Sequence, residues 1–416
     1  MSSVTLAKSL DRQSLMRLAD WLAVAVAVSL PWSTSATSIL VALWLVAVLA
    51  TLDLKAVRRE VATAAGGLPI LLWALGAAGM LWADVSWGER FAGFSSFNRL
   101  LALPLVLAQF RRSDNGVWVL RGFFLSVVGV LLLSWTIVLM PGPPPISTKS
   151  FGVPVKDYIL QSTNFLICAF ALFECASQEL GAGRWRTSVG LIALSLAFVA
   201  NILFVAVGRT TLVVAPVLVL LFGWRRFGWR GLVSAGLVGG IVAAAAWFES
   251  PYLRQRLDTS MAEFEAYRAS DQLSSTGLHA AFLRESLRIV AKAPLLGHGT
   301  GSIAGQFRGV VTGESGSSSM TTVNPHNQIF AVAIQLGLVG AAVLIAMWVA
   351  HLMLFRGSSF TAWLGLLVVV QNVVSSLFNS HLFDFTQAWI YIFGVGVAGG
   401  MMLRERDRAA SLASRP

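Results

Sequence analysis

The amino-acid sequence predicts an all-α, polytopic membrane protein with about 12 transmembrane helices and one long helical loop on the outer side of the membrane. Hydrophobic residues make up 56% of the 416 residues and charged residues only 12%, whereas roughly a quarter of the residues in a soluble domain are charged. The mean hydropathy is +0.72. Apolar stretches also recur at close to the ~20 residues that a helix needs to cross the hydrocarbon core.

The apolar stretches define the predicted spans. The fourth and the eighth are short, and a short span tilts little, borrows flanking residues or lines a cavity that is walled by protein. The stretches lie at 14–31, 36–52, 66–82, 97–110, 117–140, 158–176, 187–207, 211–222, 231–248, 327–354, 360–378 and 386–403.

The orientation follows from lysine and arginine, which concentrate in the cytoplasmic loops of membrane proteins. Most of the 31 basic residues lie in termini and short loops on one side of the predicted spans. We therefore expect both termini in the cytoplasm. The net charge of +11 then reflects topology, and nucleic-acid binding has little support. The basic residues on this side are Lys8, Arg12, Arg17, Lys55, Arg58, Arg59, Arg111, Arg112, Arg121, Arg184, Arg186, Arg225, Arg226, Arg230, Arg356, Arg404, Arg406, Arg408 and Arg415.

Three regions follow from this pattern. Residues 1–248 hold transmembrane helices 1–9, residues 249–325 form the outer loop with amphipathic helices, and residues 326–416 hold helices 10–12 and a short cytoplasmic tail. Within the loop, apolar residues recur every three or four positions after Pro251, which is typical of an amphipathic helix that lies on the membrane surface. These residues are Leu253, Leu257, Met261 and Phe264.

A second loop helix is predicted over 277–292, because Pro294 and the glycines of 297–301 end it. Its basic face is more typical of a surface that contacts solvent or headgroups than of a binding site. The small, polar residues 302–322 predict a mobile loop, and the proline-rich segment 141–157 predicts a stiff connector. The predicted apolar face holds His279, Phe282, Leu283, Ser286, Leu287 and Val290, and the basic face holds Arg284, Arg288 and Lys292.

Arg209 is the first candidate for chemistry. It lies in Gly208-Arg209-Thr210, at the outer mouth between the seventh and eighth spans. An arginine at the bilayer centre costs on the order of 2.5 to 3.5 kcal/mol on insertion scales and less near the interface, so it is expected to have an anionic partner. That partner is either an anionic substrate or the phosphate of a lipid headgroup.

His326 is the second candidate. It lies in the run 323–328, where the polar loop returns to a hydrophobic helix, and histidine exchanges protons near neutral pH. The alternative is structural, because Asn324 or His326 could cap the tenth helix. We expect no metal site, since the five histidines show no paired ligand spacing. They are His279, His298, His326, His351 and His381.

In this order, four motifs resemble the O-antigen ligase and polymerase family. They are Gly208-Arg209-Thr210, the run from Ser274 to Leu278 that opens a helix, the run from Pro294 to Gly301 that ends it, and Asn324-Pro325-His326-Asn327-Gln328 leading to Gln335-Leu336-Gly337. The resemblance implies an inverting, metal-independent glycosyltransferase without a cofactor. It would move O-antigen polysaccharide from undecaprenyl diphosphate to the lipid A core oligosaccharide, on the periplasmic side of the bacterial inner membrane.

The resemblance also implies roles for individual residues. Arg209 would bind the donor diphosphate and His326 would act as the catalytic base. The family usually has an arginine where this chain has His279, so His279 or Arg284 is the candidate for a second diphosphate-binding group. Asn324 and Asn327 are candidates for acceptor binding or support. The alternative reading is an O-antigen or exopolysaccharide polymerase with the same donor. A transporter or flippase is less favoured, because the sequence shows no clear internal repeat.

Overall fold

The computed structural model describes residues 11–140, 150–206, 208–311 and 316–413. Within these residues all regular secondary structure is helical, apart from one isolated bridge between Ser150 and Val153. This confirms the predicted all-α class. Residues 141–149 of the predicted stiff connector and residues 312–315 of the predicted mobile loop lie outside the described part of the chain.

The first ten helical elements lie before Arg209. They are α1 (Arg12–Ser29), α2 (Thr34–Ala50), α3 (Leu54–Val61), α4 (Ala64–Gly79), α5 (Trp87–Ser95), the 3₁₀ helix η1 (Phe97–Leu101), α6 (Ala102–Arg112), α7 (Gly116–Leu139), α8 (Tyr158–Gly181) and α9 (Trp185–Phe204). They are followed by α10 (Arg209–Glu249), α11 (Pro251–Ser270), α12 (Ser275–Lys292), α13 (Ile303–Val310), the 3₁₀ helix η2 (Gly316–Ser319), α14 (Gln328–Leu354), α15 (Phe360–Ser375) and α16 (Phe385–Ala413).

Six helices in the described part of the chain are long and apolar enough to cross a membrane, or up to eight if each bent pair counts as one span. The six are α7, α8, α9, α10, α14 and α16. Each predicted stretch does lie in a helix, but α4 and α15 have 16 residues each, fewer than the ~20 that the hydrocarbon core requires. A multi-pass membrane protein is therefore supported, whereas the number of 12 spans is not confirmed.

The long run α10 consists of two antiparallel helices. Gly228 interrupts it with φ 61° and ψ −144°. A Cβ atom on Gly231 would meet the carbonyl of Gly223, and one on Gly236 would meet the side chain of Leu220. In both pairs one residue precedes Gly228 and the other follows it, yet the two lie close together in space. The chain therefore reverses direction at Gly228. The eighth and ninth predicted stretches thus form a tight hairpin without a loop.

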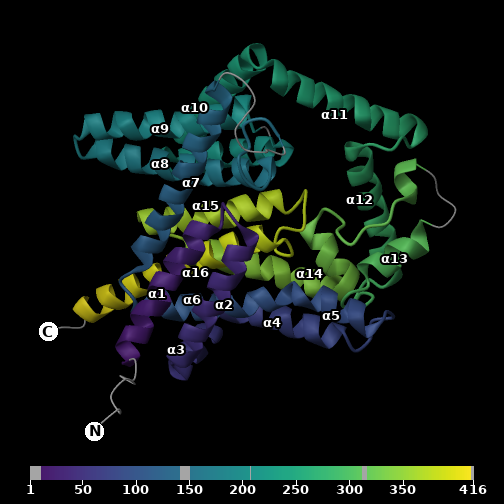
Figure 1. Ribbon diagram of the computed structural model, residues 1–416, viewed down its shortest axis with the longest axis horizontal. Coiled ribbons are helices and arrows are strands. Elements are labelled where there is room, and N and C mark those ends of the chain that lie inside the picture. The colour runs from purple at the N-terminus through teal and green to yellow at the C-terminus, as the bar shows by residue number, and fades with distance from the viewer. Residues whose placement is uncertain (1–10, 141–149, 207, 312–315, 414–416) are drawn as a thin grey trace, which may run out of the picture.

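Segments that the charge pattern assigns to the cytoplasm lie together at one end of the molecule. Arg111 at the end of α6 donates to Glu60 in α3 at 3.0 Å and to Asp407 in α16 at 2.7 Å. Figure 1 shows the start of α1, the end of α16 and the α8–α9 turn at the left end, and α5, α12 and α13 at the right end. The two predicted sides thus correspond to opposite ends. Which end faces the cytoplasm stays a prediction.

The first long apolar helix of the C-terminal region, α14, is also broken. Gly337 has φ 64° and ψ −163°, in the middle of the tenth predicted span. A break in a membrane helix frees backbone carbonyls and N–H groups, and these need partners because lipid offers none.

The glycine-rich loop 294–301 supplies these partners. The backbone N–H groups of Leu338 and Val339 donate to the carbonyls of Pro294 and Leu295, at 2.7 and 3.3 Å, and those of His298 and Gly299 donate to the carbonyls of Ile334 and Gln335, both at 2.9 Å. A glycine is required at Gly299, which has φ 86° and whose Cβ would meet Ala83. The glycines therefore allow the backbone of the loop to approach α14 and Ala83 closely.

The same loop extends to α4 and the start of α5. Thr300 donates its backbone N–H to the carbonyl of Gly79 at 3.0 Å and its hydroxyl to that of Gly76 at 2.6 Å. Gly301 donates its N–H to the Gln335 side chain at 2.8 Å. The end of α12 is thereby fixed against both α4 and α14.

The segment 249–325 contains the helices α11 and α12, as predicted, but three details of the prediction are wrong. The helix α11 has little amphipathic character, because its apolar and polar residues are not segregated to opposite faces. Residues 303–310 form α13 instead of a mobile loop, because Phe307 is fully buried and packs edge-on against Phe282. Leu283 and Leu287 are exposed rather than on the inner face of α12. Glu285 takes their place, and Arg284 and Arg288 neutralise its carboxylate.

We expect Gly337→Ala to lower the melting temperature of the detergent-solubilised protein by several degrees. A left-handed backbone costs alanine about 1 kcal/mol or more, and the new Cβ would lie 2.1 Å from the carbonyl oxygen of Leu295. Gly190→Ala is the control, because nothing lies within 4 Å of a Cβ there. Equal melting temperatures for the two variants would contradict the structural role of the break.

Candidate active site

His326 lies in a strained turn that is held by side-chain contacts. Its φ is +54°, a conformation that is unfavourable for a residue with a side chain. Asn324 stabilises the turn, since its Oδ1 accepts the backbone N–H of His326 at 2.9 Å. The Nδ2 of Asn324 donates to Oδ1 of Asn379 at 2.7 Å. Asn379, in the α15–α16 loop, thus holds the backbone of His326 in place through Asn324.

The helix cap of α14 is Asn327. Its Oδ1 accepts the backbone N–H groups of Ile329 and Phe330, at 2.9 and 3.2 Å, and its Nδ2 donates to the carbonyl of Leu377 at 3.1 Å. The alternative in which Asn324 or His326 caps this helix is therefore wrong. The His326 side chain is free of that structural task.

The imidazole of His326 lies against α12. Its ring centroid is 4.4 Å from that of His279, with the planes at 60°. On another side it stacks on Phe282, at 5.8 Å and 9°. Phe282 is 6% exposed, so one face of the His326 ring packs on a buried apolar side chain. The two histidines come from separate elements, and the junction at loop 294–301 sets their separation.

Arg209 is the first residue of α10 and contacts the first turn of α12. Its Nη1 donates to Oγ1 of Thr276 at 3.0 Å, and its Nη2 lies 3.5 Å from Oε2 of Glu263 on α11. The anionic partner of Arg209 in the structure is thus Glu263, a side chain of the protein itself, where the sequence led us to expect a substrate or a lipid headgroup. Behind Arg209, the hydroxyl of Thr211 donates to the hydroxyl of Ser162 in α8 at 2.8 Å, which anchors the start of α10.

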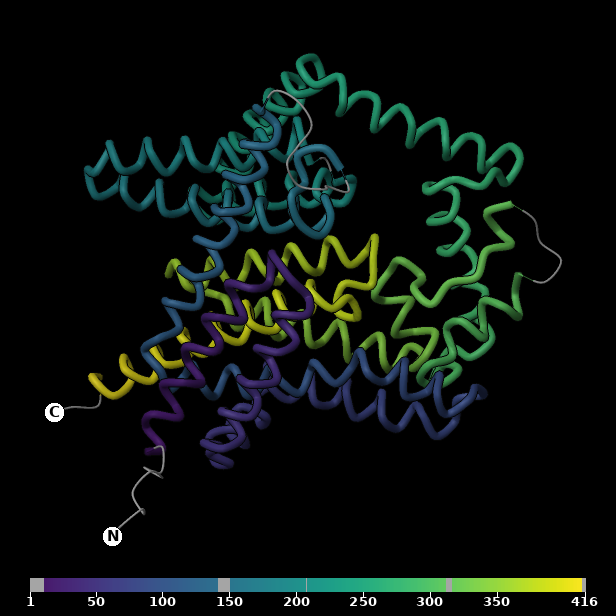
Figure 2. The backbone as a smooth tube through the Cα atoms, viewed as in Figure 1, coloured from purple at the N-terminus to yellow at the C-terminus, as the bar shows by residue number. Residues whose placement is uncertain are grey.

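These contacts bring three predicted site residues together. Arg209 touches Thr276, Thr276 and His279 lie one turn apart on α12, and His279 touches His326. Figure 2 shows α11 as a strap that leaves the end of α10 and reaches α12 away from the main body of helices. The cluster lies where α10, α11, α12 and α14 meet.

Both histidines are held in the neutral state. Loss of surrounding water, followed by the nearby charges of His326 and Arg209, lowers the pKa of His279 to about 4. Burial lowers the pKa of His326, and a side-chain hydrogen bond with Asn379 partly opposes the shift. At neutral pH, His326 is therefore able to accept a proton. Arg209 is the cation of the cluster.

Arg284 is engaged elsewhere. Its Nε donates to Glu285 at 2.8 Å and its Nη2 to Ser318 at 2.7 Å, on the side of α12 that faces η2. Its role in diphosphate binding stays a prediction, as do the acceptor roles of Asn324 and Asn327. Among the described residues, no group of three or more metal-binding side chains is found.

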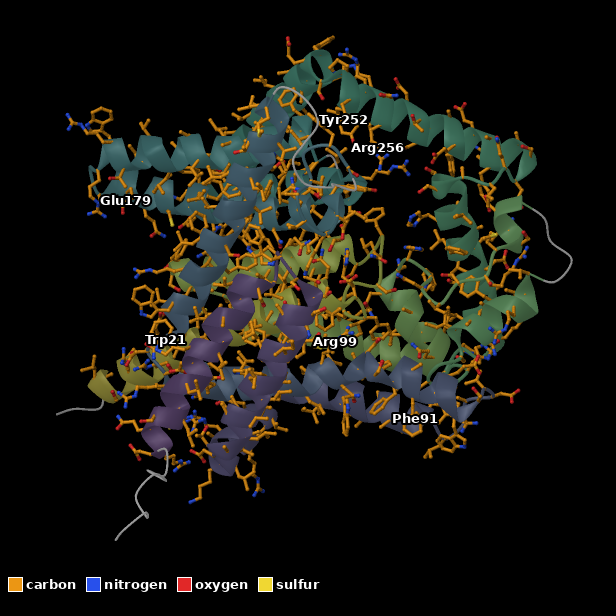
Figure 3. The ribbon with its side chains drawn as sticks, viewed as in Figure 1. Trp21, Phe91, Arg99, Glu179, Tyr252 and Arg256 are labelled. Atoms are coloured by element: carbon orange, nitrogen blue, oxygen red, sulfur yellow. The ribbon has the colours of Figure 1, made fainter. Side chains whose placement is uncertain are left out.

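Sequence reasoning missed four residues around the cluster. Glu263 and Thr276 bind Arg209, and Asn379 holds the His326 turn. Arg256 lies on the inner side of α11 in Figure 3, where it donates to the Tyr158 hydroxyl at 3.0 Å and lies over its ring. Spacing on α11 places Arg256 and Glu263 two turns apart on one face. This shared face was the sequence signal that could have identified the two residues.

Comparison with known proteins finds one family match. Residues 193–345 match the family model described as O-antigen ligase. The matched segment runs from α9 into α14 and includes Arg209, His279 and His326. A search of the curated proteins finds no match. The family indicates a glycosyltransferase of ligase or polymerase type and implies lipid-linked glycan substrates in a membrane.

Asn379→Ala is expected to lower kcat of glycan transfer about ten- to a hundredfold with little change in KM, because a misplaced reacting group loses rate rather than binding. The Asn324 amide would lose its acceptor and the His326 turn would relax. Steady-state kinetics on the purified protein measure the split. Asn98→Ala, which loses a hydrogen bond from Trp73, is the control. A raised KM with unchanged kcat would argue against the positioning role.

Proposed function

Because residues 193–345 carry the O-antigen ligase domain, we propose that the protein moves O-antigen polysaccharide from undecaprenyl diphosphate to the lipid A core oligosaccharide. The reaction would take place on the periplasmic side of the bacterial inner membrane, with both termini in the cytoplasm. The observation that carries the proposal is the contact between a neutral histidine pair and an arginine at one end of the helices.

Arg209 would bind the diphosphate of the donor. A sugar on a diphosphate already has a good leaving group, so the enzyme mainly has to neutralise the charge that develops as the bond breaks. A guanidinium suits this task because it donates several hydrogen bonds in one plane. Arg209 is also the first residue of α10, so the positive end of the helix dipole adds to its charge.

His326 would remove the proton from the acceptor hydroxyl. The acceptor oxygen attacks the anomeric carbon, the bond from that carbon to the diphosphate oxygen breaks, and the hydroxyl proton passes to the imidazole. The diphosphate leaves with the bonding electron pair. Attack from the face opposite the diphosphate inverts the anomeric centre. The lowered pKa of His326 keeps the base unprotonated at neutral pH.

His279 would contribute a hydrogen bond without a charge. Its pKa of about 4 leaves the imidazole neutral at pH 7, and one ring nitrogen then carries a proton that it can donate to a phosphate oxygen. Beside His326, a neutral neighbour leaves the base free of an added cationic charge. We therefore assign His279 to orienting the diphosphate and Arg209 to neutralising it.

His326→Ala and Arg209→Ala are expected to abolish attachment of glycan to the core when each is expressed in a gene-deletion strain, since a positioned base alone supplies about 10²- to 10⁴-fold. Arg209→Lys should retain part of the activity because it keeps the charge. Gels of surface glycans report the outcome. Free core with accumulated long lipid-linked polymer in the deletion strain indicates a ligase, and core with a single repeat indicates a polymerase. Wild-type gels from both alanine variants would refute the site.

We expect kcat/KM to be constant near neutral pH and to fall as the pH drops through the lowered pKa of His326, because protonation removes the base.

The stability of the fold should also decrease as the pH falls. His279 has a pKa of 6.5 when unfolded and about 4 when folded, so the unfolded chain binds more protons between these values and stability decreases as the pH falls. Melting temperatures of wild type and His279→Gln measure this. An equal decrease in both would contradict the assignment.

A further inference from the structure

The carboxylate of Glu263 occupies a site built from three hydrogen-bond donors. Its Oε2 lies 3.5 Å from Nη2 of Arg209 and accepts the backbone N–H of Thr276 at 3.0 Å. It also accepts the hydroxyl of Thr276. Thr276 belongs to the first turn of α12, so the carboxylate lies at the positive end of that helix.

The same donors suit a phosphate group. Guanidinium, hydroxyl and an amide at a helix N-terminus are the groups that bind phosphates in proteins. The Nε of Arg209 is buried and has no acceptor among the described residues, which leaves one more donor for a ligand. Hydrogen bonds from Thr276, and then Arg209, lower the pKa of Glu263. The group that now fills the site is therefore an anion of the protein itself.

We propose that Glu263 is an internal competitor for the phosphate-binding groups of Arg209 and Thr276, and that its return to them releases the lipid diphosphate product. The inference rests on the function proposed above, since it takes Arg209 as the diphosphate-binding residue. The bound carboxylate and a bound diphosphate exclude each other, because both need Nη2 of Arg209 and the amide of Thr276.

Charge makes such a competitor useful after transfer. The donor is a diphosphate diester with two ionised oxygens. The product is a monoester, whose terminal phosphate ionises again with a pKa near 6. The product therefore binds a cationic site more tightly than the donor does and would block the next cycle. A carboxylate tethered on α11 has a fixed local concentration, so it lowers the product's affinity in every cycle.

The packing of α11 allows Glu263 to leave and return. The start of the helix is held by a small cluster of Leu253 and Leu257 with residues of α9 and α10. Its end is set by Asp271, which has φ 51°. Between these points, Met261 and Phe264 are 61% and 40% exposed. Little buried apolar surface thus fixes the segment that carries Glu263.

The test is the affinity of the full-length protein, purified in neutral detergent, for farnesyl diphosphate, a short lipid diphosphate monoester. Calorimetry should show about tenfold tighter binding to Glu263→Gln, because the variant lacks the competing charge-assisted contact. Glu263→Asp keeps the charge on a shorter side chain and should lie between the two. Glu265→Gln is the matched control, since it removes the same charge from an exposed position on the same helix.

In transfer assays, the rate of Glu263→Gln should fall more steeply than that of Glu265→Gln as product accumulates. Unchanged or weaker binding of farnesyl diphosphate to this variant would overturn the competitor role. Weaker binding would mean that Glu263 instead positions Arg209. Adding Arg209→Ala to Glu263→Gln should remove the gain in affinity. If Arg209→Ala alone leaves the affinity unchanged, the proposed donor site fails and this inference fails with it.

Discussion

The pairing of loop 294–301 with the break in α14 is the constraint on which the site depends. At Gly337 the helix gives up its own hydrogen bonds, and two carbonyls and two N–H groups are satisfied by the loop instead. In a membrane body such groups are too costly to leave unpaired. The loop directly follows α12, which carries His279, and α14 directly follows His326. The hydrogen bonds therefore fix α12 against α14, and with them the 4.4 Å between the two imidazole centroids.

A second set of polar contacts fixes His326 from the opposite side. Both contacts come from the α15–α16 loop. The backbone N–H of Gln328 donates to the carbonyl of Ser376 at 2.8 Å, and the backbone N–H of Leu382 donates to the Gln328 side chain at 2.8 Å. Asn379 holds Asn324. A backbone with φ +54° at His326 persists only because these contacts over-determine the turn. A catalytic group in such a turn is already oriented when substrate arrives, which is what positioning requires.

Much of the fold and part of the site could be predicted from the sequence. Apolar length and the distribution of arginine predict helices and their two ends, because both follow from local composition. Arg209 and His326 became candidates because they are polar groups beside apolar spans, and their proposed roles came from the family resemblance. Asn379 and the break at Gly337 depend on contacts between segments that are far apart in the chain, and no local pattern encodes those. For Glu263, spacing on α11 gave its face but not its partner. The apolar face of α12 was predicted wrongly because hydrophobic periodicity counts Glu285 as a surface residue. In the structure Glu285 is buried, and it pairs with Arg284 and Arg288.

The charge balance of the cluster explains how a histidine can stand at position 279. The resemblance implies an arginine there, which would place a second fixed cation beside His326. That cation would bind the leaving diphosphate more strongly, but it would also lower the pKa of the base and hold the product. With His279 neutral, Arg209 is balanced by Glu263 at 3.5 Å and the base keeps a neutral neighbour. In the proposed reaction, neutralisation of the leaving group would then depend on one guanidinium and the starts of α10 and α12. The histidine would thus exchange some stabilisation of the departing diphosphate for easier release of it.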